Sequence, residues 1–310
     1  MVSIWQIFLA LFNYEIYNFK IIYYVNLIIF SVFFNEAYIQ IYKKNKLSKI
    51  FLILAASFIL VFSLIHPSNN GIILNHLGSV EVDLLGGFLF ILCIYLGLSL
   101  LENYSFNKFN ILFILTAIVV LSKPSYLILI IYPLIITFLI KKNFLILTNF
   151  ILVILSFFYL SRGFITSGCL VFPFALSCID TFWSLDIESV QKYENIILGF
   201  ARDKLRYTDF DYVINSYDWV LPWFKNYFLK TSLLQIYILC IFVSLIIIIF
   251  QKYKNIKLLD LNLYLILCFL FGCFLFWLRA PEVRFGFGTI ISLSILIPSL
   301  FIYFQLKNFK

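Results

Sequence analysis

Long apolar segments separated by short polar connections constrain the fold of this sequence more than any other feature. Residues 21–41, 84–101 and 289–304 are examples. Such segments hold about 15 to 21 residues, enough or nearly enough to cross about 30 Å of hydrocarbon as a helix. Backbone groups inside a bilayer need internal hydrogen bonds, and continuous apolar runs satisfy them as helices. The pattern predicts an all-α fold, a polytopic transmembrane helix bundle with about nine or ten membrane segments.

The composition excludes two broad classes of protein. Of the 310 residues, 63% are hydrophobic and 12% are charged, whereas soluble domains carry about 25% charged residues. The formal net charge is +8. The cations lie in short clusters at the ends of apolar segments, which is typical of membrane orientation and not of a nucleic-acid surface. The lipid bilayer is therefore the expected partner, and no nucleic-acid partner is expected.

The distribution of lysine predicts the orientation of the chain. Twelve of the 18 Lys residues fall in connections on one side of the bilayer, such as 43–49, 141–142 and 252–257. Short cytoplasmic loops carry the excess of Lys and Arg in membrane proteins, so this side is placed in the cytoplasm. The sequence thus predicts a multi-pass protein of the bacterial inner membrane. Connection 66–83, which lacks Lys and Arg, is placed outside the cytoplasm.

One large polar loop, residues 161–231, divides the chain into three parts. It holds eight of the 15 carboxylates and three of the five Trp residues, and it is predicted to be extracytoplasmic. Residues 1–160 are expected to form the N-terminal transmembrane helices, and residues 232–310 the C-terminal ones. Lys123-Pro124 is expected to break the apolar stretch 110–140 into a hairpin of helices or a kinked pair, because Pro disfavours helix at the residue before it.

The large loop is predicted to contain an amphipathic helix over residues 186–205. Ser184 is the expected N-cap, and acidic residues occupy the first turn, where they favour a helix N-terminus. An apolar stripe at spacings of three and four is expected to face the membrane surface or the ends of the bundle. It comprises Val190, Tyr193, Ile197, Phe200 and Ala201. Two interpretations remain open: a helix that serves packing alone, and a lid over a lipid-linked substrate.

Two cysteines in the large loop, Cys169 and Cys178, are expected to form a disulfide. They lie close together in the sequence, and the compartment outside the bacterial inner membrane is oxidising. A bond between them would close the turn around Pro173. The alternative is a pair of buried free thiols. Metal binding is disfavoured, since no His lies near either cysteine in the sequence.

Three cations, Lys123, Arg279 and Arg284, lie on the predicted outer side, against the orientation rule. Cations near the depth of the bilayer are costly unless they are paired or functional. A structural salt bridge is one interpretation, since Glu282 stands between the two Arg residues in the sequence. A binding site for a phosphate or pyrophosphate is the other, because an Arg guanidinium recognises phosphate through two parallel hydrogen bonds.

Two carboxylates, Glu81 and Asp83, lie in the outer connection that lacks cations. One of them could act as a general base, or bind a divalent cation that bridges a phosphate. Alternatively, both are solvated acids that favour the N-terminus of the following helix. His66 and His76 in the same connection match no zinc spacing, so the need for a metal stays open.

We expect the three cations to converge with Glu81 or Asp83 on one cleft beneath the large loop. Fixed anions would offset the cost of placing the cations there, and a lipid-linked phosphate would supply the remaining negative charge. In the competing interpretation, the three side chains are unrelated and extend separately into the lipid headgroup region. A shared site requires the charged groups within about 10 Å of one another, about one Debye length at 0.1 M salt.

Several motifs resemble one family of membrane enzymes. Asp83-Leu-Leu-Gly-Gly, Leu121-Ser-Lys-Pro-Ser-Tyr-Leu and the apolar run that ends at Lys141-Lys142 are similar to the middle of GT-C type glycosyltransferases. Gly168-Cys-Leu-Val-Phe-Pro and Trp277-Leu-Arg-Ala-Pro-Glu-Val-Arg resemble a group of bacterial membrane proteins associated with surface-glycan synthesis. Together the similar stretches cover about two thirds of the chain.

The resemblance implies a function on the outer face of the membrane. GT-C enzymes transfer a sugar from a polyprenyl-phosphate or related carrier, so a lipid-linked sugar donor and a glycan acceptor are the implied partners. These enzymes carry their main acidic residue in the first outer loop, where this chain offers only Glu15. Either a first helix and its loop precede residue 1, or the activity differs from that of the family. The alternative function is a non-catalytic or transport protein that handles lipid-linked oligosaccharide.

Overall fold

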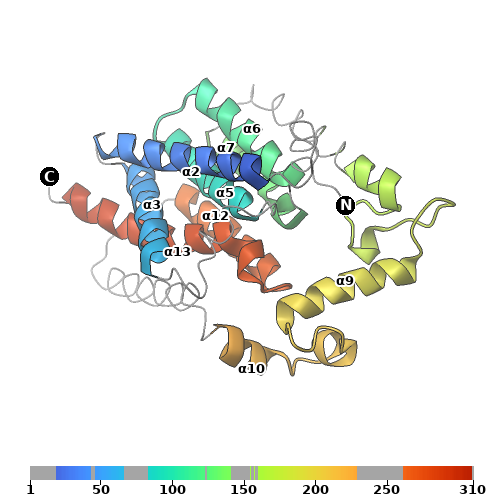
Figure 1. Cartoon of the computed structure of the whole chain (residues 1–310). Helices are drawn as coiled ribbons and strands as arrows, with labels where there is room; N and C mark the ends of the chain where they lie inside the picture. The colour runs from blue at the N-terminus through green and yellow to red at the C-terminus, as the bar shows by residue number, and fades with distance from the viewer. Residues whose placement is uncertain are drawn as a thin grey trace.

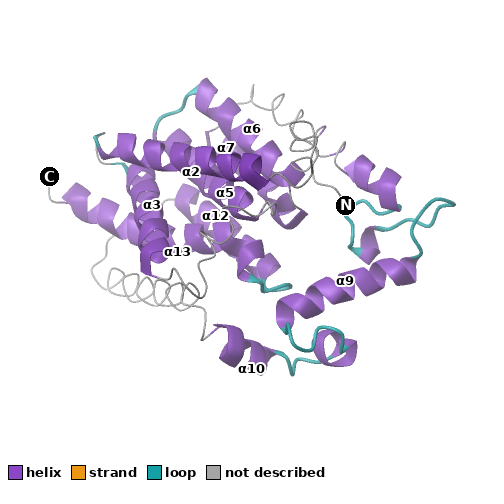
Figure 2. Ribbon diagram, viewed as in Figure 1, coloured by secondary structure: helices purple, strands orange, loops and turns teal. Residues whose placement is uncertain are grey.

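The computed structural model describes residues 19–42, 46–65, 83–122, 124–140, 154, 157, 160–228 and 261–308. Within these ranges the fold is all-α, as predicted, and Figure 2 shows helices joined by loops. The bundle consists of α2 (Phe19–Ile41), α3 (Leu47–Ile65), α5 (Asp83–Glu102), α6 (Phe106–Ser122), the 3-10 helix η1 (Pro124–Ile130), α7 (Ile131–Ile140), α12 (Leu261–Trp277) and α13 (Val283–Asn308). The large loop holds η3 (Ala175–Ser177), α9 (Ile187–Arg202), η4 (Asp211–Asn215), α10 (Val220–Trp223) and η5 (Phe224–Phe228).

Helix α5 lies at the centre of the bundle (Figure 1). It packs against α2, α3, α6, α7 and α13. Nearly every residue from 85 to 100 is buried, so the helix has no solvent-exposed face. A helix that is apolar on all sides is stable only where other elements or lipid surround it, and here other helices of the same chain do.

Helix α6 packs antiparallel to α5. Lys108, near the start of α6, donates a hydrogen bond to Ser99 Oγ near the end of α5 (2.8 Å). About two turns further along α6, Thr116 donates to Cys93 Sγ (3.7 Å). Rising residue numbers in α6 thus meet falling residue numbers in α5, which fixes the relative direction of the two helices.

The segment η1–α7 runs back along α5, parallel to it. Tyr126 lies against Gly86 near the start of α5, and Tyr132 lies against Gly97 near its end. α6 and η1–α7 therefore form a helical hairpin. The predicted break at Lys123-Pro124 is confirmed on both sides, because α6 ends before it and a 3-10 helix begins at the proline. Lys123 itself lies outside the described residues.

A polar network ties α2, α3 and α5 together at the end of the bundle where α5 stops. Glu36 Oε1 accepts hydrogen bonds from Tyr95 OH (2.8 Å) and from Gln40 Nε2 (2.5 Å). Glu102 at the end of α5 accepts from the backbone N–H of Ser48 (3.0 Å), at the start of α3. The carboxylate of one helix thereby satisfies a donor in the first turn of another.

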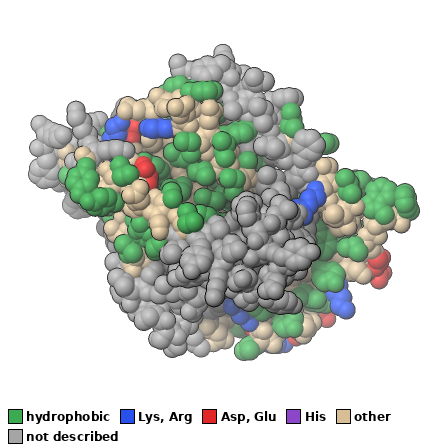
Figure 3. All heavy atoms as spheres, turned by 45° about the horizontal axis from the view of Figure 1, so that its top comes forward, with side chains coloured by type: hydrophobic (Ala, Val, Ile, Leu, Met, Phe, Trp, Pro, Cys, Tyr) green, Lys and Arg blue, Asp and Glu red, His purple; other side chains and the backbone are tan. Residues whose placement is uncertain are grey.

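The outside of the bundle carries many large apolar side chains. Large hydrophobic side chains are exposed along the helices, and they include Val32, Ile111, Ile118, Phe138, Tyr264 and Phe271. Figure 3 shows hydrophobic side chains gathered over one face of the described part. Two helices, Leu85–Glu102 and Phe285–Leu306, are long and apolar enough to cross a membrane by length and composition. The shorter apolar helices hold 10–17 residues: Ile28–Ile41, Leu47–Leu60, Phe106–Val120, Ser125–Ile140 and Asn262–Trp277.

The predicted amphipathic helix of the large loop exists as α9, with two corrections. The helix is shorter than expected at both ends. The N-cap is Asp186, whose carboxylate accepts from the N–H of Ser189 (3.3 Å), and not Ser184. Ser184 is instead occupied in the preceding turn, where its hydroxyl donates to Thr181 O (2.8 Å). The expected stripe is also divided, because two of its members are buried and two are exposed.

The division of the stripe has a structural cause. α9 packs on η3 and η4, so the buried residues of α9 face the large loop itself and not a flat membrane surface. Val190 and Ala201 are buried there, while Tyr193 and Ile197 are exposed. Gly199 permits close packing of the turn that follows α9, because a Cβ at this position would lie 2.4 Å from Tyr207 O.

Candidate functional site

The elements that carry the candidate site residues meet at one end of the bundle, which we call the α12–α13 end. α12 stops there at Trp277, and α13 begins six residues later. The two helices are locked by Trp277, since a Cβ at Gly286 would lie 2.5 Å from Trp277 Cδ1. Trp277 Nε1 also donates to Glu282 O (2.7 Å), which closes the connecting turn, residues 278–282.

A glycine contact brings the first turns of α5 and α13 to this same end. A Cβ at Gly87 would lie 2.4 Å from Phe287 Cδ1, and a Cβ at Gly288 would lie 2.9 Å from Gly87 O. Asp83 stands one turn before Gly87, and Arg284 stands one turn before Gly288. The backbones of these two predicted site residues therefore begin neighbouring helices side by side.

The 3-10 helix η1 joins this group through Tyr126, which lies against Gly86 and contacts Phe90 with ring centroids 5.8 Å apart. The helices α5, η1 and α13 thus all start at the α12–α13 end of the bundle. The side chains of Asp83 and Arg284 lie outside the described residues, and so do Glu81 and Lys123. The convergence of their charged groups stays a prediction.

Arg279 is the predicted site residue whose side chain the structure describes. Its guanidinium donates to Glu194 Oε1 of α9 (2.6 Å) and stacks over the ring of Phe174, 4.6 Å from the centroid. The other oxygen of Glu194 accepts from the N–H of Ala175 (2.9 Å). Arg279 therefore ties the turn 278–282 to α9 and to the loop that carries Phe174.

Glu282 was expected to pair with Arg279 or with Arg284, and the structure shows that it does not pair with Arg279. The carboxylate of Glu282 is nearly buried and pairs with Lys204 (3.4 Å), which follows α9. The turn folds back at Ala280, whose carbonyl accepts from the N–H of Glu282, so the Arg279 and Glu282 side chains leave it toward different partners. Arg279 does not extend alone, because its guanidinium pairs with Glu194.

A further cation, Arg202, lies beside Arg279, and it was not among the site residues predicted from the sequence. One guanidinium nitrogen donates to Val213 O (2.6 Å) and another to Arg279 O (3.4 Å), while the group stacks over Trp219, 4.9 Å from the ring centroid. Burial, and then the positive charge of Arg279, lower the pKa of Arg202. Within the described ranges no carboxylate forms an ion pair with it.

The reason that Arg202 escaped notice is its position in the sequence. A cation in the last turn of a helix is the ordinary complement of the helix dipole. The nearest signal in the sequence is that Arg202 and Lys204 directly follow the apolar stripe that ends at Ala201. We call the group formed by Arg202, Lys204, Arg279, Glu194 and Glu282 the charged junction.

Aromatic packing fixes the rest of the large loop to the charged junction. Trp223 of α10 donates from Nε1 to Pro281 O (3.3 Å). Its ring meets that of Trp277 edge to face, with centroids 6.5 Å apart. α9 and α10 thus both attach to the turn 278–282, and Figure 1 shows them beside the bundle beyond the end of α12.

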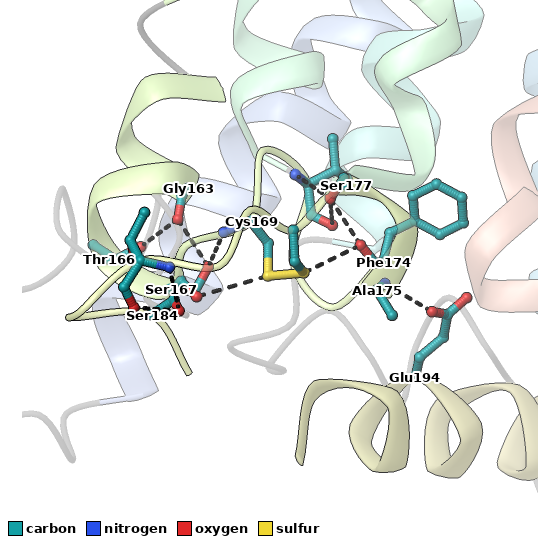
Figure 4. The surroundings of a disulfide bond; sticks show 12 residues. Gly163, Thr166, Ser167, Cys169, Phe174, Ala175, Ser177, Ser184 and Glu194 are labelled. Carbon is teal, nitrogen blue, oxygen red and sulfur yellow. Dashed lines mark hydrogen bonds between the residues drawn. A yellow bond between two sulfur atoms is a disulfide. The ribbon is translucent and has the colours of Figure 1, made fainter. Parts of the chain in front are cut away.

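The loop that carries Phe174 is closed by a disulfide between Cys169 and Cys178 (S–S 2.07 Å). Figure 4 shows Glu194 reaching from α9 toward this closed loop, where it accepts from Ala175. A continuous chain of interactions therefore runs from the disulfide through Glu194 to Arg279. Elsewhere, in the ranges that can be described, no group of three or more His, Cys, Asp or Glu side chains is arranged to hold a metal ion.

The comparisons with known proteins place the chain in a family without an assigned activity. No curated protein matches the chain, and no solved structure matches it. Residues 1–291 match a family described as a domain of unknown function, DUF8201. Since the match covers nearly the whole chain, the protein belongs to the DUF8201 family.

Proposed function

We propose that the chain is a polytopic protein of the bacterial inner membrane with about nine or ten membrane segments. Residues 1–160 and 232–310 hold the membrane helices, and residues 161–231 form an extracytoplasmic loop. Support comes from the two helices long enough to cross a membrane, from the shorter apolar helices around them and from their exposed apolar side chains. The lysine-rich connections lie on one side in this topology, in accord with the orientation rule.

We further propose that the protein is a GT-C type glycosyltransferase. It would transfer a sugar from a polyprenyl-phosphate carrier to a glycan acceptor at the outer face, in cell-envelope polysaccharide synthesis. One observation carries this proposal: the first turns of α5 and α13, with Asp83 and Arg284, begin side by side at the α12–α13 end, where the charged junction also lies. Helix N-termini favour bound anions, and Arg recognises phosphate.

The proposed transfer assigns a role to each residue. Arg284 and Lys123 bind the phosphate of the donor, and Arg279 holds the turn that positions Arg284. Asp83, or alternatively Glu81, removes the proton from the acceptor hydroxyl. The acceptor oxygen forms a bond to the anomeric carbon, the bond from that carbon to the phosphate oxygen breaks, and polyprenyl phosphate leaves with the bonding electrons. In the alternative role of these carboxylates, they would hold a divalent cation that neutralises charge on the leaving phosphate.

A second candidate function is the transport or non-catalytic binding of lipid-linked oligosaccharide. The network of Glu36, Gln40 and Tyr95 favours it, because these polar groups lie inside the bundle. Ionisable groups within membrane helices often mark the path of a substrate. This network lies at the opposite end of α5 from the α12–α13 end, so it does not by itself form a path through the bundle.

Transfer from a panel of polyprenyl-phosphate sugars, measured with the full chain in nanodiscs, tests the proposal. We expect Asp83→Asn to lower the transfer rate by about 100-fold or more with donor binding unchanged, as for loss of a general base. Arg284→Ala is expected to weaken donor binding. Arg206→Ala is the matched control, since Arg206 is exposed and pairs locally with Asp209 (2.8 Å). Donor binding without transfer by the unaltered protein would favour the second candidate, and absence of donor binding would refute both.

A further inference from the structure

The segment from the end of the disulfide-closed loop to the first residue of α9 exposes much apolar surface. Phe182 is 97% exposed and Leu176 is 87% exposed. Ile179, Trp183, Leu185 and Ile187 are exposed as well, so apolar side chains crowd a stretch of about a dozen residues. We call residues 176–187 the apolar tip. Contiguous exposed apolar surface of this kind marks a contact with another molecule or with lipid.

The exposure is built into the fold and is not a feature of a loose loop. Two hydrogen bonds hold the tip to the end of the preceding helical segment, residues 160–167, and to the residue after it. They run from the N–H of Ile179 to Gly168 O (2.9 Å) and from the N–H of Leu185 to Ser167 O (3.2 Å). Gly168 adopts φ +78°, and a Cβ there would lie 2.3 Å from Ser184 Cβ. Only glycine satisfies both demands, so the backbone determines that the tip projects outward.

Phe182 and Trp183 lie in a tight turn within the apolar tip. The N–H of Ser184 donates to Thr181 O (3.1 Å), and the N–H of Thr181 donates to Ser184 Oγ (3.1 Å). Phe182 and Trp183 lie between these two residues and meet edge to face, with centroids 4.7 Å apart.

The tip is continuous with the apolar outside of the helix before it. Trp183 packs on Phe164, with ring centroids 5.9 Å apart. The helical residues Ile154, Phe157 and Ile165 around this position are exposed too. If that helix spans the membrane, as proposed above, its apolar exterior leads directly to the tip.

The charge of the tip identifies the partner further. Asp180 is the one charged residue between Gly163 and Leu185, and the acids Asp186 and Glu188 follow at the start of α9. Basic residues would be needed to attract anionic lipid headgroups. An apolar surface with aromatic residues and no cation suits the boundary between uncharged headgroups and acyl chains.

We propose that the apolar tip inserts into the outer leaflet of the bilayer and holds the disulfide-closed loop and α9 at the membrane surface. This inference rests on the proposal that the chain spans the membrane. The tip would thereby fix the height of the charged junction relative to the headgroups, through the chain of contacts from the closed loop to Glu194 and Arg279. The interaction depends on burial of apolar surface and not on headgroup charge.

The test uses the full chain labelled with 5-fluorotryptophan in phosphatidylcholine nanodiscs. Three variants each add one Trp at an exposed apolar position: Phe182→Trp on the tip, Leu205→Trp elsewhere in the large loop and Phe271→Trp on the outside of α12. Leu205 is the matched control, because it is 90% exposed in the same loop. Fluorine relaxation is measured with a nitroxide on the lipid acyl chain and with a water-soluble gadolinium chelate.

We expect the acyl nitroxide to relax Phe182→Trp at least about threefold more strongly than Leu205→Trp, with the opposite order for the chelate. Replacing half of the lipid by phosphatidylglycerol should leave this ratio unchanged. The inference is overturned if the Phe182→Trp signal responds to the chelate alone. It is also overturned if added oligosaccharide shifts this signal and the acyl nitroxide does not relax it. The Phe271→Trp variant separates the two proposals. If the nitroxide relaxes Phe271→Trp but not Phe182→Trp, only the proposal that the tip inserts is contradicted. If the nitroxide relaxes neither variant, the proposal that the chain spans the membrane is contradicted.

Discussion

Arg279 and Glu194 form an ion pair, 2.6 Å long, between residues 85 positions apart in the sequence. One partner lies in the turn that joins α12 to α13, and the other lies on α9 in the large loop. Because Glu194 also accepts from the N–H of Ala175, a single carboxylate connects three parts of the chain. The pair is therefore a structural link between the bundle and the large loop, next to the turn that leads to Arg284.

The first prediction concerns the energy of this link. In a double-mutant cycle of Arg279→Met and Glu194→Gln, we expect a coupling free energy of about 1 kcal/mol, the upper range for partly exposed pairs with charge-assisted geometry. Gln is chosen because its amide oxygen keeps an acceptor for Ala175. Chemical unfolding of the protein in detergent measures the coupling. The same cycle on Arg206 and Asp209, an exposed local pair, should give a smaller coupling free energy. Equal coupling free energies for the two pairs would contradict the structural role of the Arg279–Glu194 link.

The second prediction concerns the disulfide. We expect the peptide that contains Cys169 and Cys178 to be two hydrogens lighter in non-reducing mass spectrometry than after reduction. Closure of a loop of about ten residues removes chain entropy from the unfolded state, so Cys169→Ser with Cys178→Ser should destabilise the large loop by about 2 to 3 kcal/mol. Alkylation of both residues without prior reductant would show instead that the cysteines are free thiols.

The third prediction concerns the close approach of α5 and α13. Gly288→Ala places a methyl group 2.7 Å from Phe90 Cβ and 2.9 Å from Gly87 O, neither of which is a flexible side-chain end. We expect a loss of about 1 to 3 kcal/mol in the free energy of unfolding, as for other overpacked cores. Gly272→Ala in α12 is the control, since nothing lies within 4 Å of its Cβ position. Alanine should stabilise the helix there by up to about 1 kcal/mol.

Features encoded locally in the sequence were predictable. The break at Lys123-Pro124 follows from the steric properties of proline, and the existence of α9 follows from its apolar spacing. The N-cap was misplaced by two residues, because Ser184 and Asp186 are both good caps and only the hydrogen bonds of the preceding turn decide between them.

The pairing of charges was not predictable in the same way. Glu282 stands beside Arg279 in the sequence and was the natural partner, yet Lys204 takes it and Arg279 pairs with Glu194. Such choices depend on how α9 docks on the turn 278–282, which no local pattern encodes. Arg202 was overlooked for the same reason, since its partners Val213 and Trp219 are assembled only by the fold of the large loop.

The last prediction concerns orientation in the membrane. The short connection 252–257 carries three Lys and is therefore placed in the cytoplasm, and a single apolar segment separates it from the large loop, so α9 should lie on the opposite side of the bilayer. A reporter enzyme that is active only outside the cytoplasm should work when fused after Asn195 and stay silent when fused after Asn255. Fusions to a reporter active only in the cytoplasm supply the control and should give the reverse result. Because one apolar segment, 232–250, separates the two fusion sites, equal activity at both would show that this segment does not cross, and an inverted pattern would place the charged junction in the cytoplasm, where it could not serve a donor on the outer face.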